Sequence, residues 1–197
     1  MTDEAKKLLA IDAEKESSRI CDTMRTALSR TLRRQGAVVA LSGGIDSSVT
    51  AALAARALGA ERVVGLLMPE RDSAPDTPRL GHLAAEAVGI RTEFEDITLV
   101  LESVGCYRRQ DEAYRQVIPE YGPDWRAKIV LPPVTESSRL RYFSLVAVSP
   151  TGTEVRKRLP AKQYLQLVAA TNFKQRVRKM LEYYYADRHN YAVCGTP

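Results

Sequence analysis

Residues 37–48 read AVVALSGGIDSS, and this stretch decides the fold. Residues 37–41 form an apolar run typical of a buried strand, and the serines and glycines after them predict a tight turn. Residues 46–58 then have apolar side chains at helical spacing, and Gly59 follows where helices commonly end. A buried strand, a glycine-rich turn and a helix are therefore expected in direct succession.

Strands and helices continue to alternate along the chain. Further runs of strand type occupy residues 62–68, 91–97 and 191–194. Further stretches with helical spacing occupy residues 4–34, 77–88 and 161–188. Alternating strands and helices predict βαβ units, which build a parallel sheet, and their right-handed connections place helices on both faces. We therefore expect an α/β fold with a doubly wound parallel sheet.

Residues 98–160 interrupt this alternation. Their first part mixes tyrosine, arginine and proline with weak periodicity, which predicts an irregular or helical segment as far as residue 133. Apolar alternation on both sides of the Pro-Gly turn at residues 149–152 predicts a β-hairpin. We expect a single domain over residues 1–197, with an N-terminal helix in residues 1–35 and an irregular and hairpin insertion in residues 98–160.

The composition excludes several classes of protein. The net charge of +5 is mild and forms no basic arm, so it fits a small anionic ligand and no nucleic-acid partner is expected. Three scattered cysteines argue against a disulfide framework, and two histidines are too few for a zinc cluster. No apolar run approaches the roughly 20 residues that cross a bilayer. We expect a cytoplasmic protein with no membrane partner.

The turn at residues 42–48 has the chemistry of a phosphate cradle. Glycines let backbone N–H groups approach an anion, and the helix start adds free donors and a positive dipole end. The turn lacks the Lys-Ser/Thr of the common P-loop and does not match G-x-G-x-x-G. It resembles instead the SGG-x-DS signature of ATP pyrophosphatases, which cleave ATP between the α and β phosphates. The plainer alternative is a serine-rich helix cap.

Asp46 has two interpretations within this turn. A carboxylate in the first turn of a helix is favoured by the dipole alone. A carboxylate beside a pyrophosphate is also the usual way in which a protein holds Mg2+ together with the phosphates. The surrounding motif favours the metal role.

Two further stretches narrow the resemblance to one family. Residues 169–181, AATNFKQRVRKML, resemble the N-x-K-x-R-x-R-M helix of ammonia-dependent NAD synthetases, and residues 190–196, NYAVCGT, resemble that family's strand ending in Gly-Thr. The resemblance implies an adenine nucleotide alpha-hydrolase-like fold. The family has a further metal-binding carboxylate beyond the Gly-Thr motif, so we expect this chain to be a C-terminally truncated member with little activity of its own.

The resemblance also implies a reaction and a set of site residues. Deamido-NAD would be adenylated by ATP with release of pyrophosphate, and ammonia would then displace AMP to give NAD. The residues assigned to ATP are Ser42, Gly43, Gly44, Asp46, Ser47, Met68 and Thr196. Asp46 would also bind Mg2+, and Arg176 would bind deamido-NAD, which makes these two the expected catalytic residues. The family implies a homodimer, with ammonia taken free or from a separate glutaminase.

Two alternatives remain open from the sequence. The chain could be the synthetase domain of another ATP pyrophosphatase or amidotransferase that adenylates a different substrate, or a truncated module that binds nucleotide without catalysis. The basic residues around Arg176 could equally form a solvated helix face. Residues 183–185, all tyrosine, are expected to pack rather than to stack on a base. His189 is expected to be structural and Cys194 an inert core thiol.

Overall fold

The computed structural model describes residues 10–131 and 142–195. The chain divides into two compact units, the first comprising Met1–Thr98 and Arg178–Pro197 and the second Leu99–Val177. The long helix α7 (Ala161–His189) contributes its first part to the second unit and its last part to the first unit. The description as a single domain with an insertion at residues 98–160 stays a prediction.

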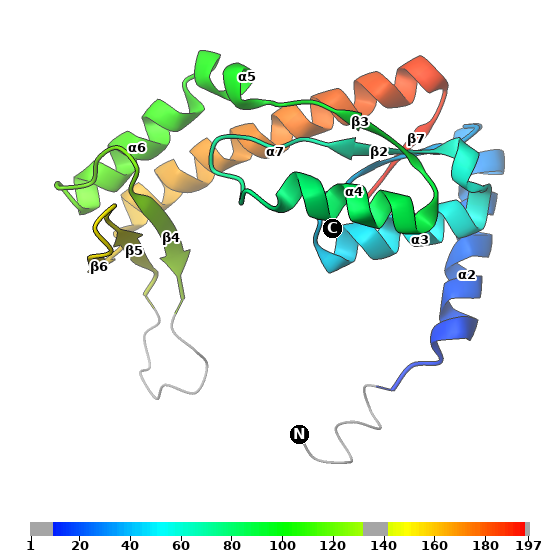
Figure 1. Cartoon of the computed structure of the whole chain (residues 1–197), viewed down its shortest axis with the longest axis horizontal. Coiled ribbons are helices and arrows are strands. Elements are labelled where there is room, and N and C mark those ends of the chain that lie inside the picture. Colours follow the sequence, from blue (N-terminus) through cyan, green and yellow to red (C-terminus); the bar gives the residue numbers. More distant parts are fainter. Residues whose placement is uncertain (1–9, 132–141, 196–197) are drawn as a thin grey trace. The chain divides into compact units, whose positions relative to one another are not determined.

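A parallel sheet of four strands forms the centre of the first unit (Figure 1). Its strands are β1 (Ala37–Ala40), β2 (Val63–Leu67), β3 (Arg91–Phe94) and β7 (Ala192–Cys194). They lie in the order β3-β2-β1-β7, so β1 is central and pairs with β2 on one side and with β7 on the other. All pairs are parallel, and the predicted parallel α/β sheet is confirmed.

The two faces of β1 and β2 are both buried. Because successive side chains of a strand point to opposite faces, Ala37 and Val39 share one face, and they pack in a core cluster with Ala51 and Ala54 of α3 (Ile45–Leu58). The same cluster includes Ala85 of α4 (Thr77–Val88). The opposite face presents Val38, Val64 and Leu66, each fully buried. Burying a side chain of this size contributes about 1.5–3 kcal/mol, which explains the continuous apolar runs.

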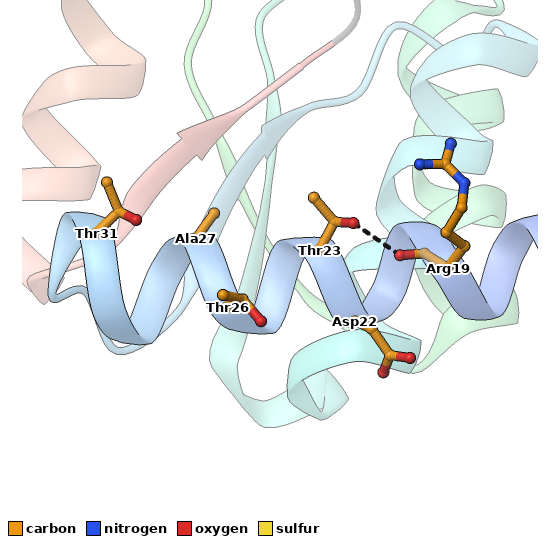
Figure 2. Close-up of a pocket in the computed structure, with 6 residues that line it drawn as sticks. All are labelled: Arg19, Asp22, Thr23, Thr26, Ala27 and Thr31. Atoms are coloured by element: carbon orange, nitrogen blue, oxygen red, sulfur yellow. Dashed lines mark hydrogen bonds between the residues drawn. The ribbon is translucent and has the colours of Figure 1, made fainter.

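Helix α2 (Ala13–Thr26) has a polar outer side. The hydroxyl of Thr23 donates to the carbonyl of Arg19 at 2.9 Å, beside a shallow hollow of about 450 Å³ on this helix (Figure 2). The helix continues as six residues of π-helix, Ala27–Leu32, and ends at Arg33, whose φ of 52° is left-handed. Of the stretch predicted to be helical, residues 4–34, the structure shows helix over residues 13–32, whereas residues 10–12 and 33–34 are not helical.

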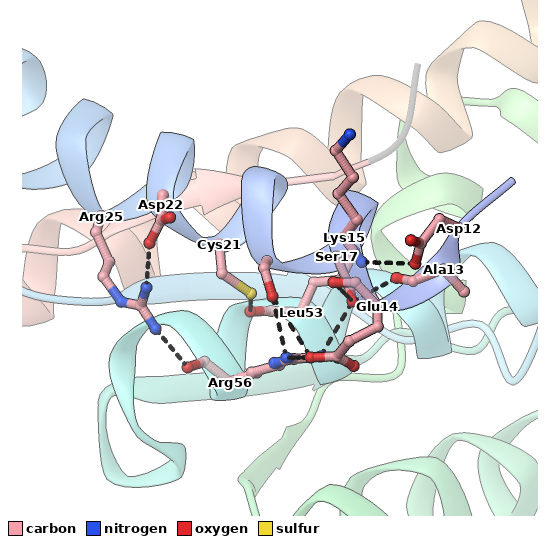
Figure 3. Close-up of polar contacts among 11 residues, drawn as sticks. Asp12, Ala13, Glu14, Lys15, Ser17, Cys21, Asp22, Arg25, Leu53 and Arg56 are labelled. Atoms are coloured by element: carbon pink, nitrogen blue, oxygen red, sulfur yellow. Dashed lines mark hydrogen bonds and ion pairs between the residues drawn. The ribbon is translucent and has the colours of Figure 1, made fainter.

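The inner side of α2 is fastened to α3 by polar contacts (Figure 3). Glu14 forms an ion pair with Arg56, and this guanidinium lowers the pKa of the Glu14 carboxyl. Arg25 donates to the carbonyl of Ala57 at 2.7 Å, at the C-terminal end of α3. The thiol of Cys21 donates to the carbonyl of Leu53 at 3.6 Å. These contacts hold α2 along the helix that begins at the glycine-rich turn.

The second unit contains a separate antiparallel sheet. Its strands are β4 (Arg126–Val130), β5 (Ser144–Val148) and β6 (Glu154–Arg158), in that order. The β5–β6 pair confirms the predicted hairpin, with Val148 opposite Glu154. Residues 98–131 also contain α5 (Thr98–Ser103) and α6 (Cys106–Val117). The prediction of an irregular or helical segment is correct for these helices and wrong for β4, which forms because β5 supplies its hydrogen-bonding partner.

The core of this unit is largely aromatic. Tyr121 lies between Tyr114 and Trp125, with ring centroids 4.9 and 5.9 Å apart, and Phe143 stacks on Tyr164 of α7 at 4.5 Å. Such pairs add about 0.5–1.5 kcal/mol beyond the area they bury. Along the described ranges, no helix is apolar enough over a sufficient length to cross a bilayer.

Candidate functional site

The order of the strands defines one position for a ligand. From β1 the chain moves outward through β2 to β3, and it later returns to place β7 on the other side of β1. The order therefore reverses between β1 and β7, and ligands of open parallel sheets bind at the carboxyl ends of the strands at such a point. The segment of residues 42–47 follows β1: residues 42–44 form the turn, and residues 45–47 are the first residues of α3. Gly195 follows β7.

The serine hydroxyls hold this turn in shape. Ser47 Oγ accepts from the backbone N–H of Ser42 at 3.3 Å and lies 3.2 Å from Ser42 Oγ. Ser42 Oγ accepts from the N–H of Gly44 at 3.3 Å, and Ser47 Oγ donates to the carbonyl of Gly44 at 3.0 Å. A hydroxyl offers one donor and two acceptor positions, so both serines keep acceptor capacity or can rotate toward an anion.

The two glycines of the turn have different roles. Gly43 has a φ of +75°, and a Cβ atom there would lie 2.6 Å from Leu80 Cβ and 3.2 Å from the carbonyl of Thr77, so the turn is pressed against α4. Gly44 has a φ of −80°, and within 4 Å a Cβ atom there would meet only Ser42 Oγ, at 3.3 Å. Gly43 is therefore needed by the fold, whereas Gly44 leaves exposed backbone open on the outer side of the turn.

The start of α3 adds anion-binding groups to the turn. Gly44 is the N-cap residue and provides no side-chain cap, so the first N–H groups of the helix face outward at the positive end of its dipole. Ser48 donates both its N–H and its hydroxyl back to the carbonyl of Gly44, at 3.2 and 2.8 Å. This arrangement suits a phosphate group.

Asp46 is the carboxylate of this helix start, and its side chain is exposed. Among the residues with described positions, no group of three or more Asp, Glu, His or Cys side chains could enclose a metal ion. Mg2+ commonly binds through one or two carboxylates, with phosphate oxygens and water completing its octahedron. A single exposed carboxylate beside a turn of this geometry therefore fits Mg2+ that would arrive together with a nucleotide.

The loop after β2 supplies a buried acid that the sequence patterns did not indicate. Met68, one of the predicted ATP residues, directly follows β2 and is 7% exposed. Glu70 is 9% exposed, and its carboxylate accepts from the N–H of Asp72 at 3.1 Å. The N–H of Glu70 donates to Ser73 Oγ at 3.0 Å, which closes the loop. A lone Glu after a strand has no recognisable spacing, so nothing in the sequence marks it.

Arg176 and Thr196, two further predicted site residues, stay predictions. Arg176 is exposed on α7 and belongs to the second unit, so its contact with a ligand stays a prediction. Its neighbour Lys174 is buried, with Nζ 5.5 Å from the centroid of the Tyr107 ring. Thr196 lies outside the described residues.

The tyrosines at the end of α7 fulfil the packing prediction only in part. Tyr185 is buried and donates to Glu95 Oε1 at 2.6 Å. This hydrogen bond, with burial, raises the pKa of Tyr185 to about 12. Tyr183 and Tyr184 are 59% and 56% exposed, and the ring of Tyr184 packs edge-on against the ring of Tyr185, with centroids 5.2 Å apart.

His189 and Cys194 flank the short strand β7. His189 lies against Tyr191, with ring centroids 5.5 Å apart, and burial is the largest cause that lowers its pKa. Cys194 is half-buried on β7, and burial raises the pKa of its thiol. Both observations agree with structural roles.

Comparison with known proteins gives a consistent family. A family model described as NAD synthase matches residues 16–118, a range that contains the turn at residues 42–47. The NH(3)-dependent NAD(+) synthetase of Mesorhizobium japonicum is 54% identical over 190 residues, which cover 96% of this chain and 60% of that protein. The protein of the same name from Rhizobium meliloti is 50% identical and covers 96% of this chain and 56% of its own length. The chain thus spans well under two thirds of these relatives.

Solved structures share the fold. An NH3-dependent NAD synthetase from Campylobacter jejuni superposes with a TM-score of 0.57 at 22% identity, over 93% of this chain and 56% of that one. An NMN synthetase from Francisella tularensis superposes with a TM-score of 0.58 at 20% identity, over 93% and 54%. These likenesses concern the fold, whereas the match of the NAD synthase model over residues 16–118, more than half of the chain, shows that the chain belongs to the NAD synthase family.

Proposed function

We propose that this chain forms the ATP-binding part of an ammonia-dependent NAD synthetase, a ligase that amidates deamido-NAD to NAD. The observation that carries the proposal is the turn at residues 42–47. It lies at the switch between β1 and β7, it leads into the N-terminus of α3, and Gly44 leaves its backbone open. These features suit a turn that binds phosphates and lacks the lysine of the common P-loop.

The proposed reaction makes one carbon–nitrogen bond in two displacements. A carboxylate oxygen of deamido-NAD attacks the α-phosphorus of ATP, and pyrophosphate leaves with the electron pair of the broken P–O bond. The nitrogen of ammonia then attacks the acyl carbon, AMP leaves, and a proton is lost to give the amide of NAD. The first displacement gathers charge on the phosphates, so fixed donors near them lower its barrier.

Each proposed site residue has a part in these steps. The N–H groups of the first turn of α3 hold phosphate oxygens beside the open backbone of Gly43 and Gly44, while Ser42 and Ser47 orient the turn and donate hydroxyls. Met68 lies against the adenine, and Thr196 contacts the nucleotide. Asp46 would hold Mg2+, which would offset phosphate charge when bound. Arg176 binds deamido-NAD through the planar, two-pronged geometry of its guanidinium group.

The proposal extends to the surroundings of the enzyme. As in the family that the sequence resembles, the complete protein would be a cytoplasmic homodimer with ATP, deamido-NAD and ammonia as small-molecule substrates. Ammonia would arrive free or from a separate glutaminase. The net charge of +5 suits two anionic substrates.

Pyrophosphate release tests this proposal. The purified chain is incubated with MgATP and ammonia, with deamido-NAD in one arm and nicotinate mononucleotide in another, because a fold neighbour is an NMN synthetase. Release that depends on deamido-NAD supports the proposal, and release that depends only on the mononucleotide reassigns the acceptor. Calorimetry with ATP accompanies the assay. ATP binding without pyrophosphate release in either arm would indicate a nucleotide-binding module without catalysis. Absence of ATP binding would refute the proposal.

A further inference from the structure

An ammonium group from helix α7 lies beside the carboxyl end of β7, and a buried acid holds it in place. Lys179 lies on α7, in the part that belongs to the first unit, and its Nζ is 2.6 Å from Glu182 Oε2. Glu182 is 2% exposed, whereas the side chain of Lys179 is 53% exposed. A buried carboxylate needs a partner charge, so Glu182 fixes one side of the ammonium while the other side is open to solvent.

This ammonium lies at the edge where the strand order reverses. A Cβ atom on Gly195 would lie 3.7 Å from Lys179 Nζ. Gly195 directly follows β7, in which Cys194 pairs with Val39 of β1. Because paired strands lie about 4.8 Å apart, Gly195 stands beside the strand end that leads into the turn at residues 42–47. Lys179 thus places a positive charge at the carboxyl edge of the sheet, on the β7 side of β1.

The pair is better suited to presenting a charge than to stabilising the fold. Lys179 is half exposed, so water screens its attraction to Glu182, while the buried Glu182 carboxylate loses solvation. An ammonium has three donors, and the contact with Glu182 uses one of them. The remaining donors lie on the exposed side of Lys179, where a phosphate oxygen can accept them.

We propose that Lys179 is a phosphate-binding residue whose ammonium donates to the bound nucleotide, and that Glu182 is the positioning residue that aims it. The inference rests on the proposed function, since it requires a nucleotide on the turn at residues 42–47. Both ATP and deamido-NAD carry phosphates, so the shared chemistry is a nucleotide phosphate. Lys179 lies within the stretch 169–181 that resembles the family's helix but is not among the residues assigned there to a ligand, and Glu182 lies just beyond that stretch.

Calorimetry on single variants tests the contact. Lys179→Met keeps the length of the side chain and removes its charge, and Lys15→Met makes the same change on the exposed side of α2. A charge-assisted hydrogen bond of the usual strength predicts that Lys179→Met weakens MgATP by about 10- to 100-fold. Adenosine, which has no phosphate, should bind to both variants within about twofold of wild type. Deamido-NAD is titrated in parallel, and the ligand that loses affinity identifies the phosphate source.

A double variant guards against a folding artefact. Lys179→Met alone leaves Glu182 buried without its partner, whereas Lys179→Met with Glu182→Gln removes both charges together. The double variant should unfold at a temperature close to wild type and still lose the phosphate contact. If wild type binds ATP and the double variant binds ATP and deamido-NAD as tightly as wild type does, the inference about Lys179 is wrong while the proposed function stands. If wild type binds neither nucleotide, both fail.

Discussion

The Cβ atom of Leu80 lies 2.6 Å from the position that a Cβ atom on Gly43 would occupy. Helix α4 therefore touches the backbone of the turn that follows β1, and only glycine fits between them. The contact fixes the path of residues 42–44, so the outward-facing backbone at Gly44 is set by packing before any ligand arrives. This preorganisation lowers the entropic cost of binding an anion.

Exchanging the two glycines for alanine should separate folding from binding. Gly43→Ala meets both the clash with Leu80 and a left-handed φ, so we expect a loss of about 1–3 kcal/mol in the free energy of unfolding. Gly44→Ala meets only the Ser42 hydroxyl and should cost about 1 kcal/mol or less. Its Cβ would nevertheless occupy the approach to the backbone, so ATP affinity should fall at least about tenfold. Urea unfolding measures the stability effect, and calorimetry measures the ATP affinity. An ATP affinity of Gly44→Ala equal to that of wild type would refute phosphate binding at this turn.

Asp46→Asn keeps the shape of the side chain and removes its charge. The carboxylate is exposed, so only its interaction with the helix dipole is lost, which is worth about 0.3–1 kcal/mol of stability. Binding of ATP should lose its dependence on Mg2+, because the one protein ligand of the proposed ion is gone. Titrations with and without Mg2+ measure this. The neighbouring Ser48→Ala variant, which keeps the charge, is the control and should retain the Mg2+ dependence.

Arg176→Lys should weaken deamido-NAD more than ATP. Lysine keeps the positive charge but cannot make a planar two-pronged contact, and such a contact is worth about 1.5–3 kcal/mol. Arg178→Lys, two residues along the same helix, is the matched control. Both affinities are measured by calorimetry in the presence of Mg2+. Equal weakening of the two ligands would instead indicate a general electrostatic effect of the basic helix face.

Tyr185→Phe should destabilise the first unit by about 2 kcal/mol, because it removes a hydrogen bond to a carboxylate. The hydrogen bond to Glu95 raises the pKa of Tyr185 to about 12, above its ordinary value of 10. A raised pKa means that the folded state retains the proton longer than the unfolded state. The stabilisation is therefore complete below pH 10 and is lost as the pH rises from 10 to 12.

The pH dependence of the Tyr185 effect can be measured by difference. Urea unfolding of wild type and Tyr185→Phe is compared at pH 8 and near pH 11.5, with the exposed Tyr183→Phe as control. The stability difference between wild type and Tyr185→Phe should shrink at the higher pH. A constant difference at both pH values would show that the phenol contributes through packing rather than through its proton.

The central sheet could be predicted because its strands are buried on both faces. Runs such as residues 37–41 and 63–67 have no polar alternation, and helices with apolar spacing separate them. Strand β4 could not be predicted, since Arg126 and Lys128 interrupt its apolar residues and its pairing depends on the distant β5. The change from α-helix to π-helix at Ala27 also leaves no trace in the spacing of side chains.

The candidate site was predictable only where several residues form one local motif. The turn at residues 42–47 combines strand, glycines and helix start within one stretch, so its place at the ligand edge followed from its sequence. Lys179 and Glu182 reach that edge from a distant helix. Their proximity to Gly195 depends on how α7 packs beside β7, and spacing along the chain contains no such information.

The pairing of β7 with β1 also governs how this domain is made. Ala37 pairs with Ala192, so the central strand acquires its second neighbour only after β2, β3 and the whole second unit have been synthesised. Contacts between such distant segments slow folding, because chain entropy is lost before the contact forms. Until then β1 has one open, apolar edge, which is the kind of edge that pairs with other chains. Production at a lower temperature or with chaperones should therefore raise the yield of soluble protein by protecting that edge during synthesis.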